Sequence, residues 1–204
     1  MSKYQLKDSH IYIDGTDIPQ NKLDITDSQL IHQIENDLLT EAYSHFSSQI
    51  TPHSTLNESY FINLHTKTFE SLYAFAGQYR DSNMSKGNSQ FCLAQYLHNE
   101  SNRIFKEIEQ DSYLAKYSED KNMFVSKLAY YKCELIALHP FYELNGRILR
   151  LYIDMLCIYN GYQPVDYSQA ISIDNYIEAS IECVQYADQS KMEEILKEGL
   201  SQAT

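Results

Sequence analysis

The segment HPFYELNGRILR, residues 139–150, joins two stretches of apolar residues at helical spacing and decides how the chain is interpreted. The His139-Pro140 pair predicts the end of one helix, because proline pushes the residue before it out of the α region. Asn145 is a favoured N-cap residue, and Gly146 would then be the first residue of the next helix. We therefore expect a helix-loop-helix with a polar loop between its two helices.

Apolar residues at helical spacing recur along most of the chain outside this segment. With only 6 Gly and 4 Pro in 204 residues, the chain is predicted to be a single all-α, mainly helical domain over residues 1–204. Residues 1–26 are expected to form an irregular arm or a short strand pair, and residues 78–92 a loop or loose hairpin. The predicted helices begin near Asp27 and then cover residues 60–76, 93–109, 124–138, 148–159, 173–187 and 188–199.

Composition and charge narrow the classes of function. The 28 acidic and 16 basic residues give a net charge of −12, which argues against nucleic-acid binding because phosphate contacts need clustered Lys and Arg. This charge is compatible with a basic partner protein, although most acidic surfaces are simply solvated. The N-terminus lacks the apolar stretch of a signal peptide, and no apolar run approaches the roughly 20 residues of a membrane helix. We therefore expect a cytoplasmic protein without membrane contact.

The four cysteines show no pattern that predicts a metal site. They form no C-x-x-C pair, and none has a histidine at metal-ligand spacing. In a cytosolic protein such residues are expected to be reduced and mostly buried thiols. These cysteines are Cys92, Cys133, Cys157 and Cys183.

The loop before the second helix carries residues suited to phosphate chemistry. The first amides of a helix lack intrahelical partners and attract anions, and Arg147 and Arg150 share one helix face close to that end. Two cations at a helix N-terminus indicate an anion with several negative charges, such as a polyphosphate. Glu143 is placed to bind Mg²⁺ beside that phosphate, and His139 could remove a proton from an incoming hydroxyl.

Each of these residues, taken singly, also has a simpler structural interpretation. A histidine before proline commonly ends or packs against a helix, and the two arginines could be surface charges with which Glu143 pairs. What favours phosphate transfer is that all of them fall in one loop of a chain with little glycine.

The segment resembles the Fic motif, H-x-F-x-(D/E)-G-N-G-R-x-x-R, at seven of its eight defined positions. Residues 72–80, LYAFAGQYR, are similar to the family segment F-x-W-A-G-x-x-R. The likeness spans about residues 60–204, and residues 60–161 would be the Fic core. It implies a Fic-type helical bundle with a small β-hairpin flap over the active site.

The resemblance implies a protein adenylyltransferase, which transfers AMP from ATP to a Tyr, Thr or Ser hydroxyl of a target protein. His139 would be the base that deprotonates the target, Phe141 a core anchor of the loop, and Glu143 the ligand of Mg²⁺. The implied ligands of the nucleotide phosphates are Asn145, Gly146, Arg147 and Arg150. The flap residues implied to dock the target backbone as an added strand are Lys86, Gly87, Asn88, Ser89, Gln90 and Phe91.

One residue departs from the family motif. Leu144 replaces the first glycine, and a leucine with positive φ is strained by roughly 1–2 kcal/mol. A differently shaped loop leaves two alternatives to AMP transfer open. The chain could be a nucleotide-binding pseudoenzyme with little catalysis, or it could transfer another phosphate-containing group, as relatives with altered loops do.

Many Fic proteins are autoinhibited by a helix with the pattern (S/T)-x-x-x-E-(G/N), whose glutamate pairs with the second motif arginine. In the short single-domain class this helix is C-terminal, so the resemblance implies that Glu198 of the helix within residues 188–204 is inhibitory. Its position at the C-terminus is what favours Glu198, since Glu194 occupies the Ser/Thr place of its frame. The alternatives are Glu194, in whose frame Ile195 replaces Gly/Asn, and then Glu35, in whose frame Ile31 replaces Ser/Thr. Inhibition in this class is linked to assembly, which implies a homo-oligomer.

Overall fold

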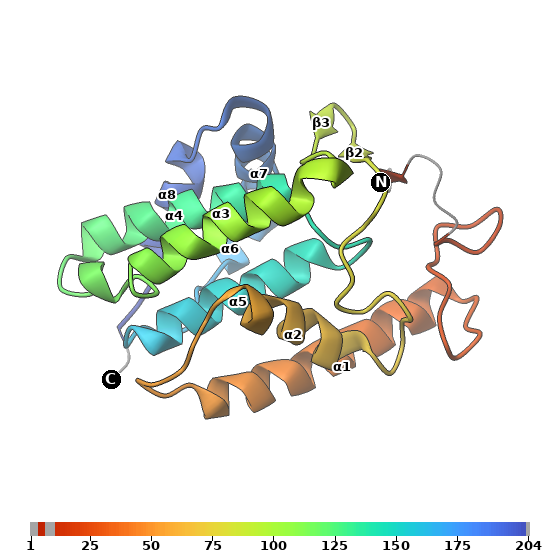
Figure 1. Ribbon diagram of the computed structural model, residues 1–204, viewed down its shortest axis with the longest axis horizontal. Helices are drawn as coiled ribbons and strands as arrows, with labels where there is room; N and C mark the ends of the chain where they lie inside the picture. The colour runs from red at the N-terminus through yellow and green to blue at the C-terminus, as the bar shows by residue number, and fades with distance from the viewer. Residues whose placement is uncertain (1–3, 7–10, 203–204) are drawn as a thin grey trace.

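The computed structural model describes residues 4–6 and 11–202, and within them the chain is mainly α-helical (Figure 1), as the sequence predicts. None of the helices in these ranges is both long and apolar enough to cross a membrane. The helices in chain order are α1 (Ser28–Gln49), α2 (Glu58–Phe69), α3 (Leu97–Gln110), α4 (Lys121–Leu138), α5 (Asn145–Tyr159), α6 (Ser168–Ser172), α7 (Asn175–Tyr186) and α8 (Ser190–Gly199).

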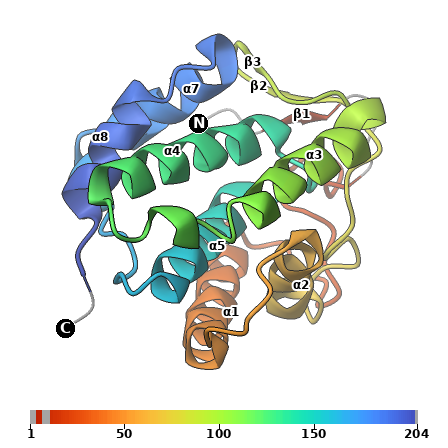
Figure 2. The same ribbon diagram turned by 60° about the vertical axis from the view of Figure 1, so that its left-hand side comes forward.

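Helices α4 and α5, which flank the loop of residues 139–144, form the centre of the bundle. Helix α5 lies between α4 and the pair α1 and α2, and α4 also contacts α3, α7 and α8 (Figure 2). Phe61 of α2, Phe105 of α3 and Tyr152 of α5 form a buried aromatic cluster with ring centroids 5.3–5.7 Å apart. The helix that begins at the motif loop is therefore fixed by packing along its length.

Two helix predictions differ from the structure. The helix predicted over residues 60–76 ends at Phe69, and turns follow it. Leu72 and Phe75 lie in these turns but are buried like residues of a helix face. Their spacing continued the helical pattern, and the helix was therefore predicted too long. Gly77 closes this segment with φ +77°, and a Cβ there would lie 1.9 Å from Thr66 Oγ1, so only glycine fits. The short helix α6 was not predicted.

The predicted hairpin is present as β2 (Met84–Lys86) and β3 (Ser89–Gln90), and the N-terminal arm adds a third strand, β1 (Gln5–Leu6). The sheet order is β1-β2-β3 and both pairings are antiparallel, with Gln5 opposite Ser85 and Leu6 opposite Met84. The arm therefore pairs with the flap through β1, which lies beside β2 (Figure 2), and it also has an isolated antiparallel bridge of its own between Tyr12 and Pro19.

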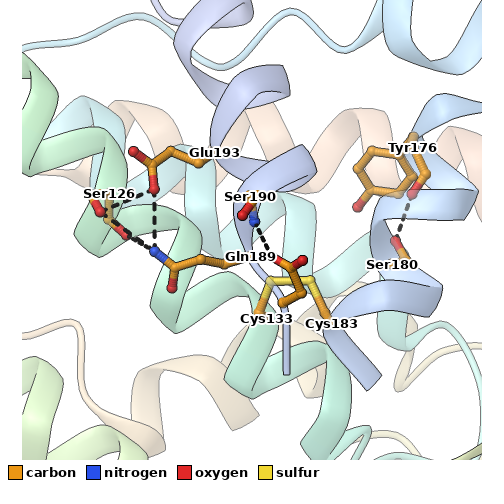
Figure 3. The surroundings of a disulfide bond; sticks show 9 residues. Ser126, Cys133, Tyr176, Ser180, Cys183, Gln189, Ser190 and Glu193 are labelled. Atoms are coloured by element: carbon orange, nitrogen blue, oxygen red, sulfur yellow. Dashed lines mark hydrogen bonds between the residues drawn. A yellow bond between two sulfur atoms is a disulfide. The ribbon is translucent and has the colours of Figure 1, made fainter. Parts of the chain in front are cut away.

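A disulfide joins Cys133 of α4 to Cys183 of α7 (Figure 3), so the expectation of four reduced thiols is wrong. The two Cα atoms lie 5.0 Å apart because α4 and α7 pack against each other, and this distance is within the range that a disulfide spans. The two residues are 50 positions apart in sequence, so no local spacing could predict the pair. The bond ties α7 to the centre of the bundle.

Loss of this disulfide should destabilise the protein measurably. Closing a 50-residue loop restricts the unfolded chain, so we expect the double variant Cys133→Ala/Cys183→Ala to unfold with about 2–4 kcal/mol less free energy in urea. Reductant should lower the stability of the wild type toward that of the variant and leave the variant unchanged. Equal unfolding midpoints of wild type and variant without reductant would contradict the bond.

Candidate active site

His139 follows the last residue of α4 in a left-handed conformation, with φ 46° and ψ 59°, and Arg80 holds the chain there. Arg80 is only 2% exposed, and its Nε donates to the carbonyl of His139 at 2.9 Å. Its terminal nitrogens donate to the carbonyls of Ser82 and Cys92, which flank the hairpin. Burial lowers the pKa of Arg80 to about 10, so the guanidinium stays charged at neutral pH.

The imidazole of His139 is buried and neutral, and one of its ring nitrogens is available to accept a proton. It is stacked on Phe91, with centroids 3.8 Å apart, and Nδ1 lies 3.3 Å from the carbonyl of Ile136. This contact assigns the proton to Nδ1, which leaves Nε2 with a free lone pair. Burial lowers the pKa of His139 to about 3, and Nε2 has no hydrogen-bond partner among the described residues.

The amide side chain of Asn145 closes the motif loop. It donates to the carbonyl of Phe141 at 2.7 Å and accepts from the amide of Phe141 at 2.8 Å. Asn145 was expected to be the N-cap, but it is the first residue of α5, and Leu144 is the capping residue. The side chain of Asn145 therefore shapes the loop, and its backbone amide is the donor left for a phosphate.

His65 of α2, which no motif of the sequence singles out, supports the same loop. Its Nδ1 accepts from the amide of Gly77 at 2.9 Å, which fixes the proton on Nε2, and Nε2 donates to the carbonyl of Glu143 at 3.1 Å. The ring also packs on Phe141 at 4.0 Å, and Phe141 is fully buried as a core anchor would be. Burial lowers the pKa of His65 to about 4. A lone histidine on an apolar helix face gives no sequence pattern from which this role could be found.

Leu144 adopts the left-handed conformation that the glycine of the family motif allows, with φ 67° and ψ 10°. Its side chain is 6% exposed and belongs to the hydrophobic core. Burial of the side chain therefore offsets the backbone strain, and the loop turns without a glycine.

Three of the four predicted phosphate ligands, Gly146, Arg147 and Arg150, line one cleft at the start of α5. The first backbone bonds of the helix run from Arg147 and Ile148 to the carbonyl of Leu144, which leaves the amides of Asn145 and Gly146 without intrahelical partners. Gly146 is exposed, and nothing lies within 4 Å of where its Cβ would be. The cleft has a volume of about 630 Å³, and its lining includes Glu143, Gly146, Arg147 and Arg150.

A second cavity of about 360 Å³ adjoins the cleft and shares Gly146 in its lining. His139 and Asn145 form part of its wall, and α7 contributes an apolar side with Ile177 and Ile181. The structure therefore brings the predicted base and the predicted phosphate ligands to two adjoining cavities. The flap residues that line the second cavity are Lys86, Gly87, Ser89 and Phe91, whereas Asn88 and Gln90 are exposed on the hairpin.

Glu35 of α1 pairs with Arg147, the first motif arginine. Its Oε2 lies 2.8 Å from Nη1 of Arg147, and its Oε1 accepts from the hydroxyl of Tyr73 at 2.5 Å. Glu35 is 4% exposed, whereas the side chain of Arg147 is 27% exposed, so only the carboxylate of the pair is buried. Arg150 instead lies against the ring of Tyr176, with its guanidinium carbon 5.8 Å from the ring centroid.

The structure does not bring Glu198 to the motif, contrary to the expectation. Glu198 is exposed at the end of α8. Two residues later, the carbonyl of Leu200 accepts a hydrogen bond from Nζ of Lys121, at the start of α4. His139 follows the other end of α4, and a helix of 18 residues is about 27 Å long. Because α8 runs away from the motif, its C-terminal glutamate is remote from both arginines.

The N-terminal arm contacts both the predicted metal ligand and the predicted base. The hydroxyl of Tyr12 donates to Oε1 of Glu143 at 2.6 Å. The ring of Tyr4 lies edge-on to His139, with centroids 5.0 Å apart. The sequence analysis assigned the arm no part in the site, because residues 4 and 12 are more than 120 positions away from the motif.

The strain at Leu144 can be measured with two variants. Leu144→Ala and Leu144→Gly both remove the buried side chain, but only glycine relieves the left-handed backbone. We expect the glycine variant to be more stable than the alanine variant by roughly 1 kcal/mol in urea unfolding. A glycine variant that is less stable than the alanine variant would show that this turn stores no strain.

The two buried imidazoles should make the protein less stable in mild acid. With folded pKa values of about 4 and about 3, His65 and His139 stay neutral while the unfolded chain takes up protons below about pH 6.5. The free energy of unfolding should therefore fall from pH 7 to pH 5, by about 2 kcal/mol for each histidine. Urea titrations of wild type and His65→Gln test this, because the variant should lose about half of the histidine contribution. A stability independent of pH in this window would contradict neutral burial.

Comparisons with known proteins agree with the fold and the motif. The model of the Fic/DOC family matches residues 55–157. A probable protein adenylyltransferase of Sinorhizobium fredii, y4lH, is 29% identical over 163 residues, which cover 80% of this chain and 82% of the relative. The probable protein adenylyltransferase Fic of Escherichia coli is 29% identical over 157 residues, which cover 77% and 76%.

Solved structures show the same fold at low identity. The BepC protein of Bartonella tribocorum, a VirB-translocated effector solved with bound AMPPNP, superimposes with a TM-score of 0.82 at 20% identity. The likeness covers 95% of this chain and 97% of that one. With the motif loop, the hairpin and the helical bundle in place, the matched region of the family model makes this chain a member of the Fic/DOC family.

Proposed function

We propose that this chain is a protein adenylyltransferase that transfers AMP from ATP to a hydroxyl group of a protein. The observation that carries the proposal is the unpartnered Nε2 of a buried, neutral His139 on a cavity that also reaches the first residues of α5. A site that only bound a nucleotide would need the helix end and the arginines but no base. The names of the two relatives, which are probable protein adenylyltransferases, support the same reaction.

The triphosphate would lie in the cleft at the start of α5. The backbone amide of Gly146, and that of Asn145 on the side of the adjoining cavity, have no partner within the helix and would supply donors for it, and the helix dipole favours its charge. Arg147 and Arg150 line the same cleft and would neutralise the β- and γ-phosphates. The adenine would lie against the apolar side of the adjoining cavity. AMPPNP bound to the BepC protein supports an adenine nucleotide as the ligand.

Glu143 is the residue that would hold Mg²⁺. No group of three or more His, Cys, Asp or Glu side chains is arranged to bind a metal in residues 4–6 and 11–202, and Mg²⁺ needs none. It commonly takes one or two carboxylates and completes its coordination with water and phosphate oxygens. One carboxylate beside an anion-binding helix end therefore fits, and the ion would neutralise charge on the phosphates during transfer.

The transfer step follows from the position of His139. Nε2 accepts the proton of the target hydroxyl as its oxygen attacks the α-phosphorus of ATP. A bond forms between that oxygen and the α-phosphorus, the bond to the bridging oxygen breaks, and pyrophosphate leaves. The target backbone would be held as a strand beside the flap, in the place next to β2 that β1 occupies in the structure.

The Glu35–Arg147 pair would restrain this activity. Arg147 is a predicted ligand of the β-phosphate, and while its guanidinium pairs with the nearly buried Glu35, less of it is available to a nucleotide. We therefore assign an inhibitory role to Glu35 in place of Glu198, exerted on Arg147, the first motif arginine, and not on the second as the family pattern implies.

Labelled ATP tests the reaction. With Mg²⁺ and cell lysate as the source of targets, label on the α-phosphate should be transferred to protein and label on the γ-phosphate should not. Replacing the base, in His139→Ala, should lower the transfer by about 10²–10⁴-fold. Transfer of the γ-label would indicate a kinase, and nucleotide binding without any transfer would indicate a pseudoenzyme.

The restraint is tested by removing one charge. Glu35→Gln keeps a partner for the hydroxyl of Tyr73 but releases Arg147, so we expect the transfer rate to rise by about tenfold, which corresponds to 1.4 kcal/mol of freed binding energy. The comparison is Glu198→Gly, which should change nothing because Glu198 is exposed at the remote end of α8. A rise with Glu198→Gly and none with Glu35→Gln would reverse the assignment.

A further inference from the structure

The edge of the flap on which a target strand would dock is already paired. β1 of the N-terminal arm lies antiparallel to β2, with Gln5 opposite Ser85 and Leu6 opposite Met84. The other side of the hairpin is not available, because β3 contacts α7 and Gln185 of α7 donates to Ser89 at 3.1 Å. The chain therefore presents its own segment where a foreign peptide would add a strand.

The residue that precedes β1 is Tyr4, and its ring lies next to the imidazole of His139, the proposed general base. The ring of Tyr4 is 5.0 Å from that of His139 and 6.0 Å from that of Phe91, and Nζ of Lys86 lies 5.2 Å from its centroid. Tyr4 is also part of the lining of both cavities, the one with His139 and the one with the motif arginines. Its side chain is thus between the base and the phosphate cleft.

The electrostatic surroundings of the Tyr4 hydroxyl agree with this position. Burial raises its pKa well above the ordinary value, Glu143 raises it further, and Arg147 lowers it. The hydroxyl is therefore protonated at neutral pH, and Tyr4 lines the cleft that Glu143 and Arg147 also line. A protonated hydroxyl becomes a nucleophile only if a base removes its proton, and the neighbouring imidazole has a free nitrogen for that purpose.

We propose that Tyr4 is an acceptor of AMP in cis, so that the enzyme modifies its own N-terminal arm. The inference rests on the proposed function, since it uses the same transfer step. The Tyr4 oxygen attacks the α-phosphorus of ATP, its proton passes to Nε2 of His139, and pyrophosphate leaves with the electrons of the broken bond.

The second tyrosine of the arm does not fit this role. The hydroxyl of Tyr12 donates to Glu143 at 2.6 Å, so it is engaged with the predicted metal ligand and not with the base. Tyr186 has the most exposed side chain of any tyrosine in the described ranges, at 72%, and it would be the acceptor expected of an unselective reaction between molecules. Modification of Tyr4 and modification of Tyr186 would give different labelled peptides.

The test is self-labelling of the full chain with ATP labelled at the α-phosphate and Mg²⁺, followed by peptide mapping. The reactions use wild type, Tyr4→Phe and Tyr186→Phe, each also in the Glu35→Gln background, and parallel reactions contain cell lysate. Tyr4→Phe keeps the ring on His139, so the arm can stay docked while the acceptor oxygen is absent. We expect Tyr4→Phe to abolish self-labelling, Tyr186→Phe to leave it unchanged, and the label to map to Tyr4.

Dilution distinguishes reaction within one molecule from reaction between two. A cis step should keep the same first-order rate constant when the protein is diluted about tenfold, because the tethered acceptor has a fixed effective concentration. A rate constant that falls with dilution would overturn the cis assignment.

The outcomes separate this inference from the function on which it rests. Label on lysate proteins without label on Tyr4, or self-label on another residue that survives Tyr4→Phe, would overturn the inference and leave the adenylyltransferase in place. No label on any protein, lysate included and in both backgrounds, would overturn the two together.

Discussion

The site depends on one buried cation, Arg80. Its guanidinium donates to the carbonyl of His139, which a helix end would otherwise leave unpaired, and to Ser82 and Cys92 on either side of the hairpin. A single side chain therefore fixes the end of α4, the position of His139 and the two chain segments that flank the hairpin. Without it several buried carbonyls would lack donors, and the imidazole and the docking strand would no longer be held in one frame.

Neutral groups hold the motif loop so that charged groups can face the cleft. His65 and Asn145 make four hydrogen bonds to backbone atoms around residues 77, 141 and 143, and both are buried. Neither needs a counterion, so no carboxylate has to lie under the loop. The fixed charges, Glu143 and the two motif arginines, remain on the open side, where phosphate and Mg²⁺ would complete their coordination.

Patterns of neighbouring residues predicted those parts of the site that are formed by residues close together in sequence. The ends of α4 and α5, the hairpin and the motif residues follow from apolar spacing, proline, glycine and the family motif. Long-range pairs did not follow: the partners of Arg80, the Cys133–Cys183 bond and the contact of Glu35 with Arg147 join segments that no spacing connects. Glu198 ranked above Glu35 because of its place near the C-terminus, although both frames lack the Ser/Thr of the pattern (S/T)-x-x-x-E-(G/N). A sequence does not say which helix end faces the motif. The oligomeric state and the cytoplasmic location stay predictions.

The pairing of β1 with β2 makes the arm a tethered competitor for any foreign strand. A segment joined to its site by a short length of chain acts at an effective concentration on the order of millimolar. A peptide that bound the hairpin alone, through a few backbone hydrogen bonds, would rarely displace it. A target has to add contacts elsewhere on the enzyme before its own strand can exchange with the arm. Selectivity would then come from surfaces outside the flap. Proteins that bind these surfaces weakly would not displace the arm from the hairpin and would not be modified.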